Sequence, residues 1–195
     1  MLIAIEGIDG AGKTTIVKFL EEELKKLGYD VVVFKEPTNS EFGKKIREIL
    51  RTREIKPEEE LELFIRDRDY DVKNNVIPAL KSGKIVLMDR YYYSTIAYQG
   101  ALGIDVDYIY KLNERFPKPD LIVILDVKPE IGLQRIKNKR KPDRFEDLEY
   151  LRRVREIFLS LKNDNVVVIN AERDLNDVKR VVLKTVLDFI RRHNV

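Results

Sequence analysis

The sequence contains no cysteine and a single histidine, and these two scarcities exclude several classes of site. Without cysteine the chain has no disulfide, no thiolate metal ligand and no cysteine nucleophile. The one histidine, His193, lies close to the end of the sequence, where chains tend to fray. Catalytic triads and zinc motifs built on histidine are therefore excluded.

A strong net charge and a long hydrophobic segment are also lacking. The 37 Lys and Arg residues against 34 Asp and Glu residues leave a net charge of +3, too even for a general nucleic-acid-binding protein. No apolar stretch approaches the length of a membrane span, and the N-terminus has no basic region followed by a long apolar segment. We therefore expect a cytoplasmic protein with no nucleic acid and no membrane as partner. The 36% of charged residues is typical of a heat-adapted composition.

Five short apolar segments recur along the chain, at residues 2–6, 31–34, 84–89, 120–126 and 165–170. They are too continuous for half-exposed strands, and their β-branched content favours a parallel sheet buried on both faces. Amphipathic segments at 15–28, 58–83 and 148–162 lie between them and indicate helices. The sequence therefore predicts one α/β domain over residues 1–195, with a five-stranded parallel sheet and helices on both faces.

A glycine-rich segment, GIDGAGKT at residues 7–14, joins the first predicted strand to the first predicted helix. It matches the phosphate-loop pattern G-x-x-x-x-G-K-[ST], in which glycines let backbone N–H groups turn toward a phosphate. We expect Lys13 to reach the β- and γ-phosphates of ATP and Thr14 to ligate Mg²⁺. The predicted ATP-binding residues are Gly7, Ile8, Asp9, Gly10, Ala11, Gly12, Lys13, Thr14 and Thr15.

The phosphate loop occurs in several protein classes, and other motifs separate them. A regulatory GTPase needs an N-K-x-D guanine reader, whereas the nearest string, NKRK at 138–141, has lysine in place of the aspartate. A small kinase remains, and it needs an acceptor site, a lid that excludes water, and cations for the transferred phosphoryl group.

Asp89-Arg90-Tyr91 ends the third apolar segment, at the edge where open α/β sheets bind ligands. Asp89 is a candidate ligand of Mg²⁺ through water, and Arg90 is a candidate for bidentate binding of an acceptor phosphate. A purely structural Asp–Arg pair is the alternative interpretation.

Two helical segments carry candidate base-binding residues. Phe64 and Arg68 share one helix face and suit a flat base with carbonyl acceptors. On spacing alone, a core phenylalanine beside a surface arginine is the better interpretation. Thr95, Tyr98 and Gln99 form a second set, with a hydroxyl, a ring and an amide on one face, and this signal is weaker.

Basic side chains are concentrated in segment 135–146, which carries Arg135, Lys137, Lys139, Arg140, Lys141 and Arg144. The segment is either a solvated helix end or a lid that closes arginines over the ATP phosphates and keeps water out. Pro142 and the isolation of the cluster in a nearly neutral chain favour the lid.

Taken in order, six segments closely resemble the thymidylate kinase family over essentially the whole chain: EGIDGAGKTT (6–15), KEPT (35–38), LFIRDR (63–68), DRYYYSTIAYQG (89–100), PKPDLIVILDV (117–127) and DRFE (143–146). The resemblance implies a P-loop NTPase-type three-layer fold and transfer of the γ-phosphate of ATP to dTMP, which gives dTDP and ADP. It also implies a homodimer.

The resemblance assigns dTMP binding to Asp9, Glu36, Pro37, Phe64, Arg68, Arg90, Thr95, Tyr98 and Gln99. It implies that Phe64 stacks on thymine, Arg68 donates to a base carbonyl, and Thr95 meets the polar edge of the base. Tyr98 lies against the sugar, where a 2′-hydroxyl would clash, and Asp9 accepts a hydrogen bond from the 3′-hydroxyl.

Some relatives carry a catalytic arginine in the phosphate loop, where this chain has Gly10. We therefore expect the lid to supply that cation, from Arg140 or Arg144 and less favourably from Arg135. The predicted catalytic residues are Lys13, Arg90, Arg140 and Arg144. Two alternatives stay open, namely a kinase of another nucleoside or nucleotide, such as UMP or thymidine, and a phosphate-loop switch or ATPase.

Overall fold

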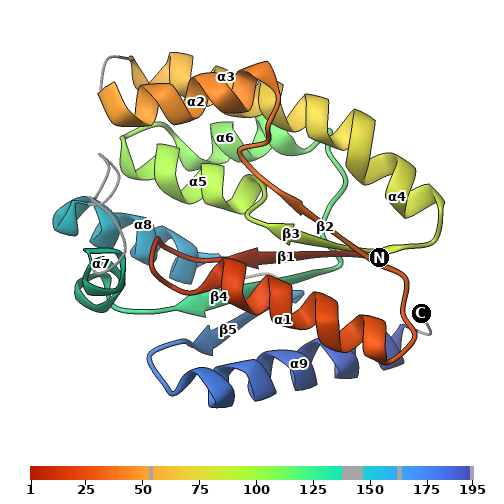
Figure 1. The fold of residues 1–195 in the computed structure, drawn as a ribbon. Coiled ribbons are helices and arrows are strands. Elements are labelled where there is room, and N and C mark those ends of the chain that lie inside the picture. Colours follow the sequence, from red (N-terminus) through yellow and green to blue (C-terminus); the bar gives the residue numbers. More distant parts are fainter. Residues whose placement is uncertain (53–54, 138–146, 162–163, 194–195) are drawn as a thin grey trace.

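The computed structural model describes residues 1–52, 55–137, 147–161 and 164–193. Within these residues five strands form one all-parallel sheet, in the order β2-β3-β1-β4-β5 (Figure 1). The strands are β1 (Leu2–Glu6), β2 (Val31–Lys35), β3 (Ile85–Asp89), β4 (Leu121–Asp126) and β5 (Val166–Asn170). Each agrees with a predicted apolar segment to within one residue at either end.

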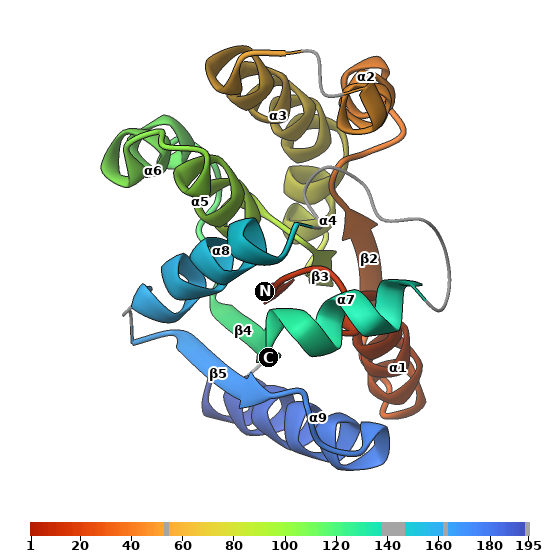
Figure 2. The same cartoon turned by 90° about the vertical axis from the view of Figure 1, so that its left-hand side faces the viewer.

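Helices cover both faces of the sheet, so the predicted fold class is confirmed (Figure 2). Helices α1 (Lys13–Lys26) and α9 (Leu175–Arg192) lie side by side on one face. The other helices are α2 (Glu41–Thr52), α3 (Pro57–Asp71), α4 (Ile77–Lys81), α5 (Tyr92–Ala101), α6 (Val106–Asn113), α7 (Pro129–Lys137) and α8 (Leu148–Ser160). Of these, α3, α5 and α8 lie on the opposite side of the sheet from α1 and α9.

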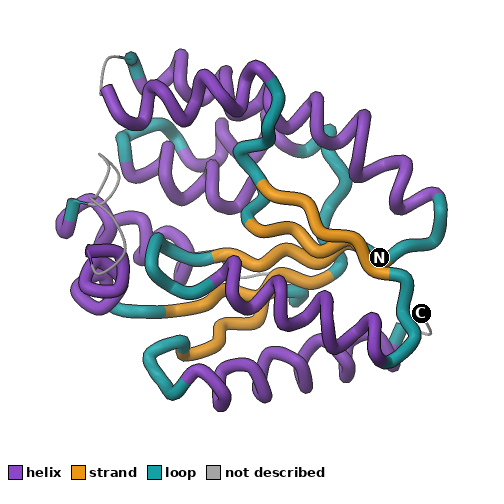
Figure 3. Tube along the Cα trace, in the orientation of Figure 1, coloured by secondary structure: helices purple, strands orange, loops and turns teal. Residues whose placement is uncertain are grey.

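The single helix predicted over 58–83 is a succession of three pieces. A π-helical segment, η1 (Val72–Val76), connects α3 to α4, and the path stays helical throughout (Figure 3). Pro78, the second residue of α4, has no N–H to donate within the helix, and the π-helical segment η1 lies directly before it.

The three central strands explain where the core and the site lie. All residues of β1 and β3 are buried, and so are all but the last residue of β4, which is why their sequences are almost entirely apolar. Since all strands are parallel, their carboxyl ends meet at one edge of the sheet. There Ile5 pairs with Asp89, and Lys35 pairs with Asp89 from the other side. Among the described residues, no helix is long and apolar enough to cross a membrane.

Asp71, the last residue of α3, is a buried carboxyl group with few polar contacts to offset the cost of its burial. Its side chain accepts a hydrogen bond from Asn75 Nδ2 at 2.6 Å, and Oδ2 has no hydrogen-bond partner in the described part of the chain. Burial raises the pKa of Asp71 to about 6, against the opposing effect of the Asn75 hydrogen bond.

Replacing Asp71 by asparagine is expected to raise the free energy of unfolding at pH 7, on the order of 2 kcal/mol. The folded state binds the Asp71 proton more tightly than the unfolded chain, so this carboxyl lowers stability as the pH rises from about 4 to about 6. Asparagine does not ionise and lacks this dependence. Urea unfolding of both proteins at pH 4 and pH 7 measures the effect, and an equal difference at both pH values would contradict it.

Candidate active site

The phosphate loop between β1 and α1 encloses the ammonium group of Lys13. Gly12 precedes α1 in the left-handed region, with φ of 94°, which glycine adopts readily. Lys13 Nζ donates to the carbonyl oxygens of Gly7 at 2.9 Å and Ile8 at 2.7 Å. Burial, together with the nearby guanidinium of Arg90, lowers the pKa of Lys13 to about 7.

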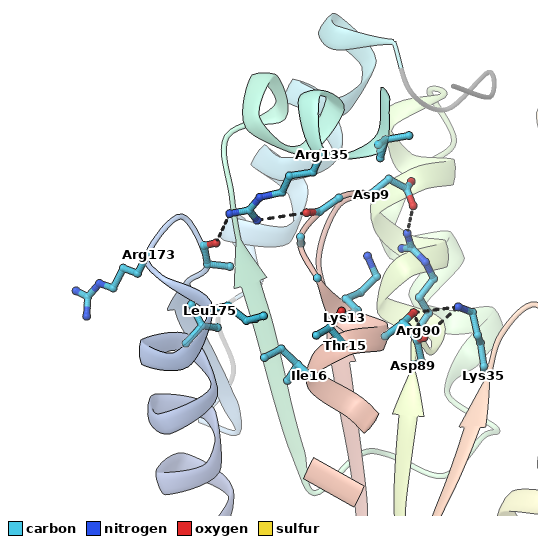
Figure 4. A pocket seen from close by; sticks show the side chains of 17 residues that line it. Asp9, Lys13, Thr15, Ile16, Lys35, Asp89, Arg90, Arg135, Arg173 and Leu175 are labelled. Carbon is cyan, nitrogen blue, oxygen red and sulfur yellow. Dashed lines mark hydrogen bonds and ion pairs between the residues drawn. The ribbon is translucent and has the colours of Figure 1, made fainter. Parts of the chain in front are cut away.

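Thr14 and Asp89 place two oxygen atoms next to each other at the carboxyl edge of the sheet. Thr14 Oγ1 donates to Asp89 Oδ2 at 2.5 Å, and the ammonium of Lys35 lies 3.1 Å from each of these two oxygens (Figure 4). Burial acts to raise the pKa of Asp89, but the Thr14 hydrogen bond and Lys35 outweigh it and hold the pKa below its usual value. The pair thus already binds one positively charged group, the ammonium of Lys35. Oxygen ligands that carry a negative charge also fit Mg²⁺.

The side chain of Arg90, directly after β3, is held by the phosphate loop and by helix α5. Its guanidinium forms an ion pair with Asp9, and Nη1 donates to Gly7 O at 3.2 Å and Ser94 Oγ at 3.0 Å. The hydroxyl of Tyr98 donates to the other carboxylate oxygen of Asp9 at 2.6 Å. Burial acts to raise the pKa of Asp9, but Arg90, Lys13 and the Tyr98 hydrogen bond together outweigh it and lower the pKa to about 2. Asp9 is therefore a carboxylate at neutral pH.

A cavity of about 690 Å³ opens over the phosphate loop, a size that suits a nucleotide (Figure 4). Loop residues 9–15 line it together with Asp89 and Arg90. Arg135 on α7 crosses its rim and donates to Gly10 O at 3.3 Å and Ala171 O at 3.0 Å. Seven further lining residues had not been assigned from the sequence: Ile16, Lys35, Ile136, Ala171, Arg173, Leu175 and Val178.

Arg68 on α3 is at the centre of a second, buried group of polar side chains. Its guanidinium is 1% exposed and forms an ion pair with Glu36. Nη1 donates to Asn113 Oδ1 at 2.7 Å, and Nη2 donates to Thr95 Oγ1 at 2.9 Å. Phe64, one helical turn away, is half-buried. The interpretation from spacing alone, a core phenylalanine beside a surface arginine, is therefore wrong.

The structure divides the predicted dTMP-binding residues into groups. Asp9, Arg90 and Tyr98 contact one another beside the phosphate loop. Deeper in the fold, Arg68 contacts both Glu36 and Thr95. Helix α5 carries Thr95, Tyr98 and Gln99 and so connects the two groups.

The remaining predicted residues lie outside these two groups. Gln99 is fully buried and donates to Glu60 at 2.6 Å, and the carbonyl oxygen of Pro37 accepts from Arg47 at 3.0 Å. The predicted lid arginines, Arg140 and Arg144, lie outside the described residues.

Comparison with known proteins supplies the family. A family model for thymidylate kinase matches residues 5–182. The chain belongs to the thymidylate kinase family. A probable thymidylate kinase of Archaeoglobus fulgidus is 52% identical over 191 residues, covering 97% of this chain and 96% of that protein.

Bacterial members of the thymidylate kinase family are also similar. A thymidylate kinase of Xylella fastidiosa (strain 9a5c) is 43% identical, over 98% of this chain and 92% of its own. A thymidylate kinase of Xanthomonas oryzae pv. oryzae (strain PXO99A) is 44% identical, over 92% of this chain and 80% of its own. The resemblance inferred from the motifs is confirmed, and the roles of individual residues remain predictions.

Gly10 and Gly132 bring the phosphate loop and α7 into backbone contact. A Cβ atom on Gly10, whose φ is 79°, would lie 2.2 Å from the carbonyl oxygen of Gly132. A Cβ atom on Gly132 would lie 2.6 Å from the carbonyl oxygen of Asp9. An arginine therefore has no room at position 10 in this arrangement.

Replacing Gly132 by alanine is expected to lower kcat/KM for ATP on the order of 10-fold or more, because the new methyl group pushes α7 away from the loop. Alanine favours the helix itself by about 1 kcal/mol, so a loss of activity is not a loss of helix. Steady-state kinetics measure the effect, with Gln134→Ala on the exposed side of α7 as control. Wild-type kinetics for Gly132→Ala would contradict the contact.

Proposed function

We propose that this protein is a thymidylate kinase that transfers the γ-phosphoryl group of ATP to dTMP. The observation that carries the proposal is that Lys13 and Arg90 donate to the same carbonyl oxygen, that of Gly7, at 2.9 and 3.2 Å. A cation for the donor phosphates and a cation for the acceptor phosphate therefore lie side by side. In-line transfer needs this juxtaposition, because the enzyme contributes mainly positioning and charge stabilisation.

The cavity over the phosphate loop is the proposed ATP site. The backbone of residues 7–15 and the ammonium of Lys13 bind the phosphates, for which Lys13 exchanges its carbonyl partners. Thr14 and Asp89 hold Mg²⁺, Asp89 through water, and the positive charge of Lys35 between them supports this assignment. Bound Mg²⁺ neutralises charge on the β- and γ-phosphates.

The acceptor dTMP is proposed to bind beside the ATP site, along α3 and α5. Arg90 binds the phosphate, Asp9 accepts from the 3′-hydroxyl, and Tyr98 lies against the sugar. Phe64 stacks on the base, and Arg68 donates to a base carbonyl.

The surroundings of Arg68 support its part in base recognition. Glu36, Thr95 and Asn113 accept from the guanidinium and fix its plane. Since Arg68 is 1% exposed, contact with a base requires side chains around it to move. We expect Glu36, Pro37 and Gln99 to shape this pocket.

A homodimer is also proposed. Three large apolar side chains are exposed on neighbouring elements, Tyr70 on α3 at 45%, Leu102 after α5 at 36% and Tyr108 on α6 at 55%. Burial of such side chains against a second copy is consistent with association. Sedimentation equilibrium gives the mass directly, and a monomer at micromolar concentration would contradict this part.

Lys13→Ala is expected to lower kcat by on the order of 100-fold or more while the fold stays intact. The ammonium stabilises charge that develops between the β- and γ-phosphates, and alanine leaves that charge unpaired. Turnover with ATP and dTMP, alongside the circular dichroism spectrum, measures both points. Lys18→Ala, on the exposed face of α1, is the matched control. Near-wild-type turnover of the Lys13 variant would refute its assignment.

Arg140→Ala and Arg144→Ala are each expected to lower kcat far more than they weaken dTMP binding. A guanidinium that touches the phosphoryl group mainly in the transition state has this kinetic signature. Arg135→Ala is expected to have a smaller effect, and Lys141→Ala in the same segment is the control. Normal kcat in both arginine variants would contradict the role of Arg140 and Arg144 as lid cations.

The acceptor preference is expected to be dTMP first, dUMP second, and UMP, dCMP, thymidine and purine monophosphates far behind. Thymidine leaves Arg90 without its phosphate, cytosine presents an amino group to Arg68, and the 2′-hydroxyl of UMP meets Tyr98. The thymine methyl group contributes only about 1–3 kcal/mol, so dUMP is a poorer substrate but still accepted. Values of kcat/KM across this panel decide the matter. If UMP or thymidine exceeds dTMP, the acceptor pocket is misassigned.

A further inference from the structure

Glu6, the last residue of β1, is a fully buried carboxylate next to the proposed acceptor site that has no part in binding either substrate. It accepts hydrogen bonds from the backbone N–H groups of Tyr91 at 2.8 Å and Ser94 at 3.3 Å. It also accepts from the hydroxyl of Ser94 at 2.5 Å. All three donors lie within four residues after Arg90 in the chain.

These contacts make Glu6 the cap of helix α5. The first N–H groups of a helix need acceptors, and the N-cap residue Tyr91 provides none from its own side chain. The carboxyl group of Glu6, on strand β1, accepts from Tyr91 N–H and Ser94 N–H, and Ser94 N–H also donates to Tyr91 O at 3.0 Å. Arg90 itself has φ of 72°, a left-handed conformation that is rare outside glycine. The cap thus fixes the chain on the C-terminal side of that strained residue.

A second connection runs through the Ser94 hydroxyl. A serine hydroxyl has one hydrogen, and here that hydrogen points to Glu6 Oε2. The lone pairs of Ser94 Oγ are therefore free to accept from Arg90 Nη1, at 3.0 Å. Burial raises the pKa of Glu6, while the Ser94 hydrogen bond and the charge of Arg90 act to lower it. The carboxylate, the hydroxyl and the guanidinium thus form one chain of hydrogen bonds.

We propose that Glu6 is a positioning residue for Arg90. Glu6 holds in place both the backbone that follows Arg90 and the hydroxyl of Ser94, and these two aim the guanidinium at the acceptor phosphate. Glu6 thereby determines how strongly the site prefers a nucleotide over its nucleoside. The inference rests on the proposed role of Arg90 in binding the phosphate of dTMP.

Glu6→Gln, Ser94→Ala and the double variant test this connection. Glutamine has the same shape and still accepts from the backbone N–H groups, but its amide N–H₂ group displaces the Ser94 hydrogen toward Arg90. Asp105→Asn is the matched control, because Asp105 caps helix α6 by accepting from Tyr108 N and does not contact Arg90. Calorimetry gives the dissociation constants of dTMP and thymidine for each protein.

Glu6→Gln is expected to weaken dTMP binding about 10-fold and to leave thymidine binding unchanged, because only the phosphate contact is lost. Ser94→Ala weakens dTMP binding less, and the double variant is no worse than Glu6→Gln, since both act through one hydroxyl. Asp105→Asn keeps the wild-type ratio of the two constants.

The proposal is overturned if Glu6→Gln keeps the wild-type ratio of the two dissociation constants. That holds whether both constants are unchanged or both are weakened equally, which is a structural effect only. A wild-type protein that does not prefer dTMP to thymidine refutes the role of Arg90, and this inference with it. If Glu6→Gln does not fold, Ser94→Ala is the test. An unchanged ratio of the dTMP and thymidine dissociation constants in that variant would contradict the proposal.

Discussion

Charged groups buried along the carboxyl edge of the sheet must be paired, and much of the structure follows from this constraint. Arg68 is 1% exposed and forms an ion pair with Glu36. Arg90 forms one with Asp9, and Asp89 forms one with Lys35. Removing one partner of such a pair costs about 3–5 kcal/mol, since it leaves a charge without compensation. The partners come from different elements, so the pairs also set how the elements pack. The site and the packing of the fold are thus the same set of contacts.

Helix α3 shows how this works for one element. Its neighbouring residues Asp67 and Arg68 both contact the segment that follows β2. Asp67 accepts from Thr38 N at 2.7 Å and Thr38 Oγ1 at 2.6 Å, while Arg68 forms its ion pair with Glu36. Two charges of opposite sign on one helix therefore fix the position of the same short loop. Phe64 is carried on that helix, so its placement depends on these contacts as well.

The fold and part of the site could be predicted from the sequence because their signals are local. Buried parallel strands are continuous apolar segments, and the phosphate loop is a contiguous motif. Arg173 and Leu175 had no such signal, because the sheet order alone brings the segment after β5 beside the loop. The burial of Arg68 was also hidden, since its partners Glu36 and Asn113 are 32 and 45 residues away. Partners supplied by distant elements leave no pattern at the residue that they stabilise.

The left-handed backbone of Arg90 has a consequence for how this sequence tolerates optimisation. Such a conformation costs roughly 1–2 kcal/mol for a residue with a Cβ atom, and glycine avoids most of that cost. Relief of backbone strain alone would therefore favour glycine at this position, but glycine would leave the carboxylate of Asp9 without its ion-pair partner. Glycine would also remove the guanidinium that the proposed acceptor site requires. At position 90 the backbone conformation and the side-chain contacts therefore favour different residues, and the contacts of the guanidinium hold the strained arginine in place.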